Sequence, residues 1–210
     1  MNIIESLKWR YAVKKFDASR ALTDEKITVL KNAFNLTATS YGLQPVKLII
    51  INDKKLKEEL VPHSWDQRQV ADASHLLIFA IENSIDNQYI NTYFNRVKEI
   101  RKTPDSVLDP FKESLINSFE EKSKNEIMNW ATRQAYLVMG NLLTVCAVEK
   151  IDACPMEGFI PEEYNRVLEL DKQGLSAVLV MPVGYRAKDD MFSNFKKVRK
   201  DIEDSVITIQ

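Results

Sequence analysis

The sequence predicts an α/β or α+β fold built around one sheet. Three apolar runs, at 47–51, 76–81 and 175–185, have the length and composition of strands, and their continuous apolar character predicts burial on both faces. Segments of helical pattern lie between them, and one helix, at 130–148, is apolar on nearly every side. Because strands alternate with helices, we expect a layered domain with the sheet in its core.

The composition is that of an ordinary globular protein. The chain has 210 residues, of which 45% are hydrophobic and 28% are charged, and it is long enough for one substantial core. Its 29 basic and 30 acidic residues give a formal net charge of −1. Charge therefore gives no reason to expect nucleic acid or an anionic membrane as a partner.

Cysteine use and hydropathy predict a soluble, cytoplasmic protein. The two cysteines, Cys146 and Cys154, are too few for a disulfide framework. No apolar run reaches the roughly 18 residues that a membrane-spanning helix needs. The N-terminal residues also lack the layout of a signal peptide.

The first part of the chain is expected to contain helices at 2–9, 23–34 and 53–61. The segment 35–45 reads as a loop of small and hydroxylated residues, which can bind a polar ligand edge or simply join helix to strand. His75 is expected to be a hydrogen-bonded residue where the second strand begins.

The segment 84–127 differs from the rest of the chain. It consists of polar helical stretches with interspersed aromatic residues and a break at 103–105. We interpret it as a helical excursion from a single domain, 1–210, that can act as a lid over a flat ligand. Packing onto the domain is the other use for its aromatic side chains.

The last part of the chain carries a turn, a basic segment and an unpaired strand pattern. The apolar helix leads through a short strand at 150–152 into a Pro/Gly turn at 153–158, whose backbone amides can face a ligand. A helix is expected at 161–170, followed by the third long strand and a basic tail at 188–200. Residues 205–210 alternate like a strand with no neighbour in sequence, and such strands often pair with another chain, which predicts a dimer.

Side chains alone supply no obvious catalyst. Glycine-rich phosphate loops, nucleophile elbows and metal motifs are absent, and the chain has five glycines. A Cys154–His75 nucleophile pair has no support from spacing. An enzyme with this sequence would therefore depend on a bound cofactor. Arg10 and Lys14 can both reach one anion, although their spacing also fits a solvated basic turn.

Five segments, at 10–17, 39–45, 72–75, 155–159 and 197–199, together resemble the nitroreductase family of FMN-dependent NAD(P)H oxidoreductases. The likeness is greatest to the oxygen-insensitive bacterial nitroreductases and dihydropteridine reductases. The resemblance implies an α+β fold with a central mixed sheet flanked by helices. It also implies an intertwined homodimer with a swapped C-terminal strand, the apolar helix in the dimer core, and two FMN sites at the interface.

By similarity, both ends of the chain and both subunits contribute to each FMN site. The expected cofactor-binding residues are Arg10, Tyr11, Ala12, Lys14, Thr39, Ser40, Gly42, Gln44, Asp66, Gln69, Pro155, Met156, Glu157, Gly158, Lys197 and Arg199. The four basic residues among them would surround the phosphate and the pyrimidine side of the flavin, and those of the 39–44 loop would come from the partner. The backbone N–H of Glu157 or Gly158 would point at flavin N5, where a donor stabilises charge during hydride transfer.

The implied activity is reduction of a flat acceptor, such as a nitroaromatic or a quinone, by NADH or NADPH in a ping-pong mechanism. Tyr41 and Phe119 are expected to form walls of the acceptor pocket. One alternative is a flavin-binding storage or sensor protein of the same fold that does not turn over nicotinamide. Another is an unrelated α/β binding domain.

Overall fold

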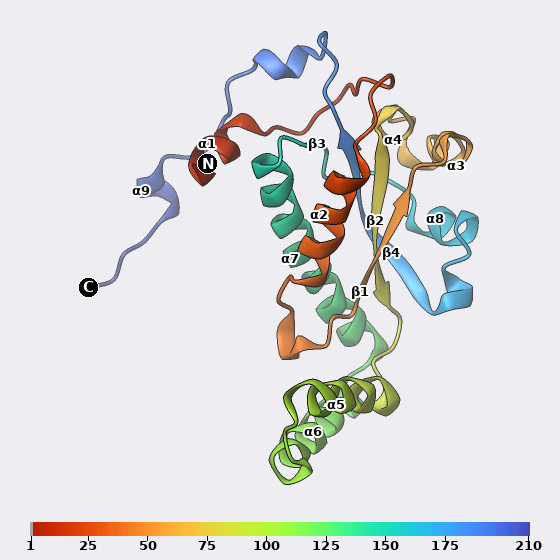
Figure 1. The fold of residues 1–210 in the computed structure, drawn as a ribbon, viewed down its shortest axis with the longest axis vertical. Helices are drawn as coiled ribbons and strands as arrows, with labels where there is room; N and C mark the ends of the chain where they lie inside the picture. The colour runs from red at the N-terminus through yellow and green to blue at the C-terminus, as the bar shows by residue number, and fades with distance from the viewer. Residues whose placement is uncertain (1) are drawn as a thin grey trace.

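A four-stranded sheet forms the centre of the computed structural model, which describes residues 2–210 (Figure 1). Its strands are β1 (Val46–Ile51), β2 (His75–Glu82), β3 (Asp152–Ala153) and β4 (Leu175–Gly184), in the order β1-β2-β4-β3. All of these strand pairs are antiparallel, whereas the resemblance implies a mixed sheet. Within residues 2–210, the parallel pairing is the isolated bridge between Ala12 and Ala153.

Helices cover both faces of the sheet. The helices of the described chain are α1 (Ile3–Trp9), α2 (Asp24–Asn35), α3 (Lys54–Leu60), α4 (Gln69–Asp72), α5 (Asn87–Arg101), α6 (Asp105–Glu120), α7 (Lys124–Val148), α8 (Pro161–Val167) and α9 (Ile202–Ser205). In Figure 1, α2 and α7 lie on one side of the sheet and α3, α4 and α8 on the other. The α+β class is thus confirmed.

The central strand β2 explains why the core has two layers. Successive side chains of a strand point to opposite faces. Leu77, Phe79 and Ile81 pack with α2 and α7, whereas Leu76 and Ile78 pack on the side of α3 and α8. All five side chains are fully buried, so the predicted burial of β2 on both faces is confirmed.

The prediction of full burial is wrong for β1. Leu48, Ile49 and Ile50 are only half-buried, because β1 is an edge strand with a neighbour on one side within the described chain. A run of apolar residues indicates a strand that other protein atoms cover. Within the described chain, the middle of β1 is covered only in part.

The long apolar helix begins six residues before the predicted start. Ser123 accepts from Glu126 N while the Glu126 side chain accepts from Ser123 N, which forms a capping box at the start of α7. One side of α7 packs on the sheet, yet Tyr136 and Leu137 are 47% and 51% exposed. Part of the apolar surface of α7 is therefore exposed to solvent within one chain.

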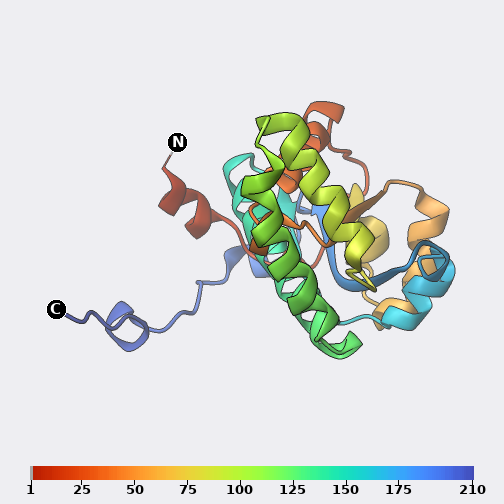
Figure 2. The ribbon, with the colours of Figure 1, turned by 90° about the horizontal axis from the view of Figure 1, so that it is seen from below.

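The segment 84–127 forms an arm across the N-terminal end of α7. Helices α5 and α6 lie side by side there in both views (Figures 1 and 2). Phe94, Leu115 and Phe119 are buried in a small separate core that also contacts Trp130 of α7. The buried aromatic residues of the arm thus pack against one another and against α7.

No helix of residues 2–210 has the length and apolar character needed to cross a membrane.

Both chain ends stand away from the sheet on the same side (Figure 2). The predicted strand at 205–210 is not a strand here, because Ser205 closes the short helix α9. Residues 207–210 make no backbone hydrogen bond within the described chain, and Ile207 and Ile209 are 88% and 93% exposed.

His75 is hydrogen-bonded at the start of β2, as predicted. Ser74 Oγ accepts from Leu22 N at 2.7 Å and lies 2.8 Å from His75 Nδ1. Because Oγ already accepts, its proton can go to Nδ1, which suits a neutral imidazole. Burial, and next the nearby Lys57 ammonium, lower the pKa of His75.

This lowered pKa predicts a loss of stability in mild acid. The unfolded chain takes up the proton near the ordinary pKa of 6.5 while the folded chain resists it, so His75 costs stability as pH falls below that value. We expect the His75→Asn variant, whose amide oxygen can replace Nδ1, to lose less stability than wild type between pH 7.5 and 5.5. Urea unfolding at both pH values measures the difference, and equal losses in the two proteins would contradict the assignment.

Candidate functional site

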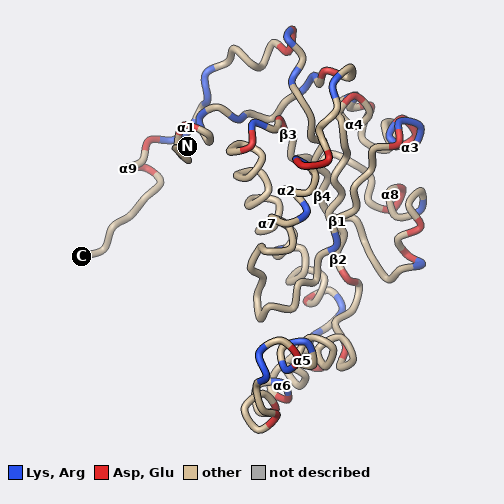
Figure 3. Tube along the Cα trace, viewed as in Figure 1, with Lys and Arg blue, Asp and Glu red and all other residues tan. Residues whose placement is uncertain are grey.

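The two chain ends meet in one basic cavity of about 390 Å³. Its lining residues are Lys8, Trp9, Arg10, Tyr11, Ala12, Lys14, Phe192, Ser193, Phe195, Lys196, Lys197, Val198 and Arg199. Six of these are Lys or Arg, and none of the described lining residues is acidic. Figure 3 shows the blue segments of the N- and C-terminal regions on this side of the molecule. We call this hollow the basic cavity.

The cations of the basic cavity are close enough to repel one another. Burial, and next Arg199, lower the pKa of Arg10. Burial also lowers the pKa of Lys197, with Arg10 and Arg199 adding to the effect. Lys197 Nζ donates to Leu7 O at 2.7 Å and to Arg10 O, which fixes it at the C-terminal end of α1. Glu5 pairs with Lys8 at 2.9 Å, but within the described chain Arg10, Lys14, Lys197 and Arg199 have no carboxylate partner, so the cavity is suited to an anion.

A buried carboxylate holds the two chain ends together. Asp190 accepts from Tyr11 Oη at 2.9 Å, from Lys14 N at 3.1 Å and from Phe192 N at 3.1 Å. It is 3% exposed. The Tyr11 pKa is raised, first by burial and then by this hydrogen bond. Sequence reasoning missed Asp190, because nothing in the pair Asp189-Asp190 distinguishes a structural carboxylate from a surface one.

The basic cavity continues directly into the turn after β3. The Ala12–Ala153 bridge places the two segments side by side. Lys14 Nζ lies 3.7 Å from the Sγ of Cys154, which is part of the Pro/Gly turn at 153–158. Burial raises the pKa of the Cys154 thiol, against the opposing effect of Lys14, so this cysteine is a buried neutral neighbour of the cation and not a reactive thiolate.

The turn presents two free backbone donors. Met156 N donates to Val180 O at 2.8 Å and Phe159 N donates to Glu157 O at 3.0 Å. The N–H groups of Glu157 and Gly158, which lie between these anchors, have no hydrogen-bond partner among the described residues. Pro155 and Gly158 are half-buried, Met156 is buried and Glu157 is exposed.

A strained segment packs against this turn. Trp65 and Asp66 both have left-handed backbone, with φ of 54° and 57°, a conformation that costs free energy in residues other than glycine. A Cβ on Gly158 would lie 2.9 Å from the Trp65 ring and from Gln67 Nε2. Only glycine therefore fits at 158 while this segment stays in place.

Two expected cofactor residues come from this segment, with different outcomes. Gln69 is buried and its Nε2 donates to Gln67 Oε1 at 3.0 Å. The Asp66 side chain is exposed. Within the described chain it does not line the basic cavity, and it is not part of the turn. Trp65, which is 66% exposed beside Gly158, was not predicted from the sequence. An aromatic residue in a polar stretch was the only available signal.

The remaining expected residues lie elsewhere in the single chain. Thr39, Ser40, Gly42 and Gln44 form the connection between α2 and β1, near the N-terminal half of α7. Ser40 N donates to the buried Gln134 Oε1 at 2.8 Å, whereas Trp9, the neighbour of Arg10, has its ring centroid 4.5 Å from Lys150 Nζ, just past the C-terminal end of α7. Gln134 lies 14 residues before the last residue of α7, which is about 21 Å along an α-helix.

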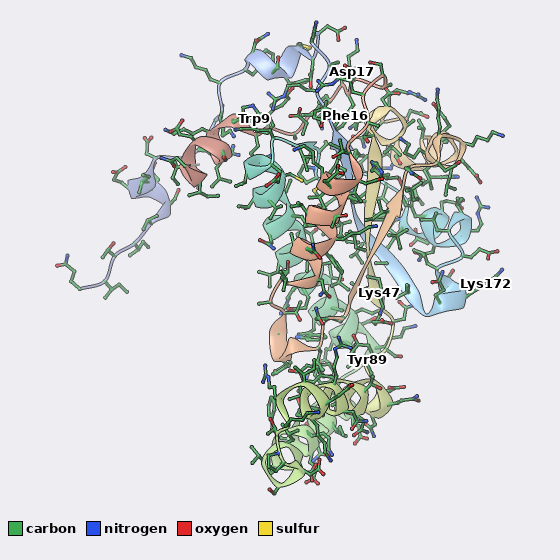
Figure 4. The ribbon with its side chains drawn as sticks, viewed as in Figure 1. Trp9, Phe16, Asp17, Lys47, Tyr89 and Lys172 are labelled. Atoms are coloured by element: carbon green, nitrogen blue, oxygen red, sulfur yellow. The ribbon has the colours of Figure 1, made fainter. Side chains whose placement is uncertain are left out.

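The expected acceptor-pocket residues group with this second region. Tyr41 stacks on Trp130 at 6.2 Å, and its ring edge meets Phe119 at 6.2 Å. Tyr41 is 46% exposed, but Phe119 is buried at 3%, so Phe119 offers little surface to a ligand in this structure. Gly42 and Gln44 line another cavity, of about 730 Å³, together with Lys47 and Tyr89, which are labelled in Figure 4.

The α+β fold combines a basic cavity with an adjoining turn of free N–H donors, and such a cavity is suited to a phosphate-bearing ligand. The model of the nitroreductase family matches residues 7–185. The chain therefore belongs to the nitroreductase family. Sequence relatives and solved structures agree with this assignment.

Sequence relatives cover nearly the whole chain. A Bacillus subtilis protein provisionally named NAD(P)H nitroreductase YfkO is 28% identical over 97% of this chain and 96% of its own. A provisionally named NAD(P)H nitroreductase of Staphylococcus epidermidis is 29% identical over 99% and 97% of the two chains.

Solved structures show the same fold. A Bacillus subtilis structure described as a nitroreductase has a TM-score of 0.87 and 20% identity, over 98% of both chains. A protein of Exiguobacterium sibiricum provisionally named a nitroreductase, solved in complex with FMN, has a TM-score of 0.85 and 19% identity, over 100% of this chain and 98% of its own.

Because Asp190 links the two chain ends, its replacement should detach the C-terminal segment from the basic cavity. Replacement by Ala leaves several partly buried donors without an acceptor, and a fully buried donor in that state costs about 1–3 kcal/mol. We expect Asp190→Ala to free the C-terminal segment, so that limited trypsin digestion cleaves after Lys196 and Lys197 faster than in wild type. The control is Asp189→Ala, because Asp189 is exposed and pairs only with Lys15. Equal cleavage rates in wild type and Asp190→Ala would contradict the tether.

Proposed function

We propose that this protein is an FMN-dependent oxidoreductase that uses NADH or NADPH to reduce nitroaromatics, quinones or similar flat acceptors. The observation that carries the proposal is the basic cavity, which has no acidic residue in its described lining and adjoins a turn with two free N–H groups. Membership of the nitroreductase family supports the same function. So do the names of the NAD(P)H nitroreductase relatives and the FMN complex of the Exiguobacterium sibiricum protein.

The residues present fit FMN on two separate criteria. Burial, and next the neighbouring cations, lower the pKa of Arg10 and of Lys197, and a phosphate monoester bound among these cations would relieve their repulsion. The free N–H groups at Glu157 and Gly158 supply uncharged donors for the ring, as expected for flavin N5. When bound, FMN supplies hydride acceptance from a nicotinamide and hydride donation to the acceptor.

The protein's own contribution is binding, orientation and donor placement. Lys14 extends the cation set toward the turn through its contact with Cys154. Pro155 and Met156 give the turn a fixed path, because Met156 is bridged to β4. Trp65 offers an exposed aromatic face beside Gly158, where a planar substrate can stack. Tyr11 and Ala12 act through Asp190 and through the backbone.

The proposed active form is a homodimer with two composite sites. The 39–44 loop and the basic cavity occupy different regions of one chain, so the loop would complete the partner's site. The exposed Tyr136 and Leu137 face of α7 and the half-buried edge strand β1 would be covered in the dimer. The apolar tail at 206–210 is suited to pairing with the partner's β1 edge, as a swapped strand.

In this arrangement Tyr41 and Phe119 would wall the partner's acceptor pocket, with Tyr41 providing most of the accessible surface. One open site used in turn by a nicotinamide and by a flat acceptor predicts ping-pong kinetics. Residues 84–127 would serve as the lid of that site.

The proposal is tested by mixing FMN-loaded protein with NADH or NADPH in the absence of oxygen. We expect prompt bleaching of the yellow colour by at least one nucleotide, because the turn and the cation set hold the flavin ready for hydride transfer. Colour should return when a quinone is added. A protein that binds FMN but stays yellow with both nucleotides would be a storage or sensor protein and not an oxidoreductase.

The role of the basic cavity makes a separate prediction. Arg199→Ala removes a charge-assisted contact of roughly 1.5–3 kcal/mol, so FMN affinity should fall at least tenfold in a fluorescence titration. Arg166→Ala is the matched control, since Arg166 is exposed on α8 and pairs with Glu163. If both variants bound FMN as tightly as wild type, the phosphate would not lie in the basic cavity.

A further inference from the structure

The turn that carries the free donors is anchored at both ends by backbone hydrogen bonds. Met156 and Val180 exchange two, of 2.8 and 3.1 Å, and Ile160 N donates to His63 O at 2.8 Å. Glu157 and Gly158 lie between these anchors. The direction of their N–H groups therefore depends on what fixes the middle of the turn.

Two side chains from different elements contact that middle. Gln67 Nε2 donates to Gly158 O at 2.9 Å from the strained segment after α3. Tyr136 Oη donates to Glu157 Oε1 at 2.6 Å from α7. Gln67 is itself held by Gln69, whereas Tyr136 is fixed by the rigid backbone of a long helix.

The bond between Tyr136 and Glu157 has little to do with burial. Tyr136 is 47% exposed and Glu157 is also exposed, so the pair is not part of the core of the chain. A phenol that donates to a carboxylate forms a short, directional, charge-assisted hydrogen bond. This bond raises the pKa of Tyr136. The contact thus provides direction and contributes little to packing.

We propose that Tyr136 is a positioning residue that sets the direction of the free N–H groups at Glu157 and Gly158. By holding the Glu157 side chain it restricts rotation at that residue. The hydrogen bond from Phe159 N to Glu157 O closes a tight turn around Gly158. A fixed backbone at Glu157 therefore also limits backbone rotation at Gly158. The inference rests on the proposed function, in which these N–H groups serve the flavin.

The first test uses full-length protein labelled with ¹⁵N-glycine and free of FMN. The chain has five glycines, so its amide spectrum is simple, and Gly158→Ala assigns the relevant cross-peak by its disappearance. We expect Tyr136→Phe to shift or broaden the Gly158 cross-peak while the peak of Gly174, which lies in the connection before β4, stays in place.

The second test uses the same variant loaded with FMN. Binding should stay within about threefold of wild type, because the basic cavity is unchanged. The rate of anaerobic bleaching by NADPH or NADH should fall about tenfold, less than the loss from removing such a donor outright. An effect on bleaching without an effect on binding separates positioning from a general structural role.

Two further variants serve as controls. Glu157→Gln keeps an oxygen that can accept from Tyr136 but loses the charge, so its Gly158 cross-peak should move less than that of Glu157→Ala. Ser123→Ala removes the N-cap of α7, 13 residues before Tyr136 of the same helix, and should lower thermal stability without moving the Gly158 peak. Should Tyr136→Phe misfold, Glu157→Ala breaks the same bond at an exposed side chain.

An unmoved Gly158 cross-peak together with wild-type bleaching in Tyr136→Phe and Glu157→Ala would overturn the inference. Failure of the proposed function has a different signature. The wild-type protein would then bind no FMN, or its bound FMN would stay yellow with both NADH and NADPH. In that case the Gly158 cross-peak alone still decides whether Tyr136 orients the turn.

Discussion

Mutual repulsion among clustered cations is the constraint on which the site depends. Arg10 is half-buried near one end of the chain, and the exposed Lys197 and Arg199 come from the other end, with no carboxylate in the described lining of the basic cavity. The two segments stay together in spite of this repulsion because Asp190 accepts hydrogen bonds from a phenol and from backbone N–H groups of both segments. A cluster of this kind is stable when an anion occupies it, which links the stability of the chain ends to ligand binding.

The sequence predicted most of the fold, because the strands and helices that matter are strongly patterned. Residues 76–81 and 175–184 were predicted correctly because a covered strand needs apolar side chains on both faces. Residues 47–51 carry the same pattern but lie at an edge, since local sequence cannot say which side of a strand has a neighbour. The C-terminal segment misled for a related reason: its alternation fits a strand, but one chain offers it no sheet to join.

The site was predictable in part, through resemblance and not through spacing. Arg10 and Lys14 are compatible with an ordinary basic turn, and only contact with residues 196–199, far away in sequence, gives them a shared cavity. Asp190, Gln67 and Tyr136 could not be identified beforehand because each acts by holding another group. Asp66 was expected from the family pattern, yet its left-handed backbone turns it to solvent.

The central claim is that cations from both chain ends gather on FMN across a pair of subunits. Native mass spectrometry of the purified protein, after incubation with FMN and removal of the excess, tests it most directly. The account predicts two chains carrying two FMN molecules. A single chain without FMN under the same conditions would contradict it.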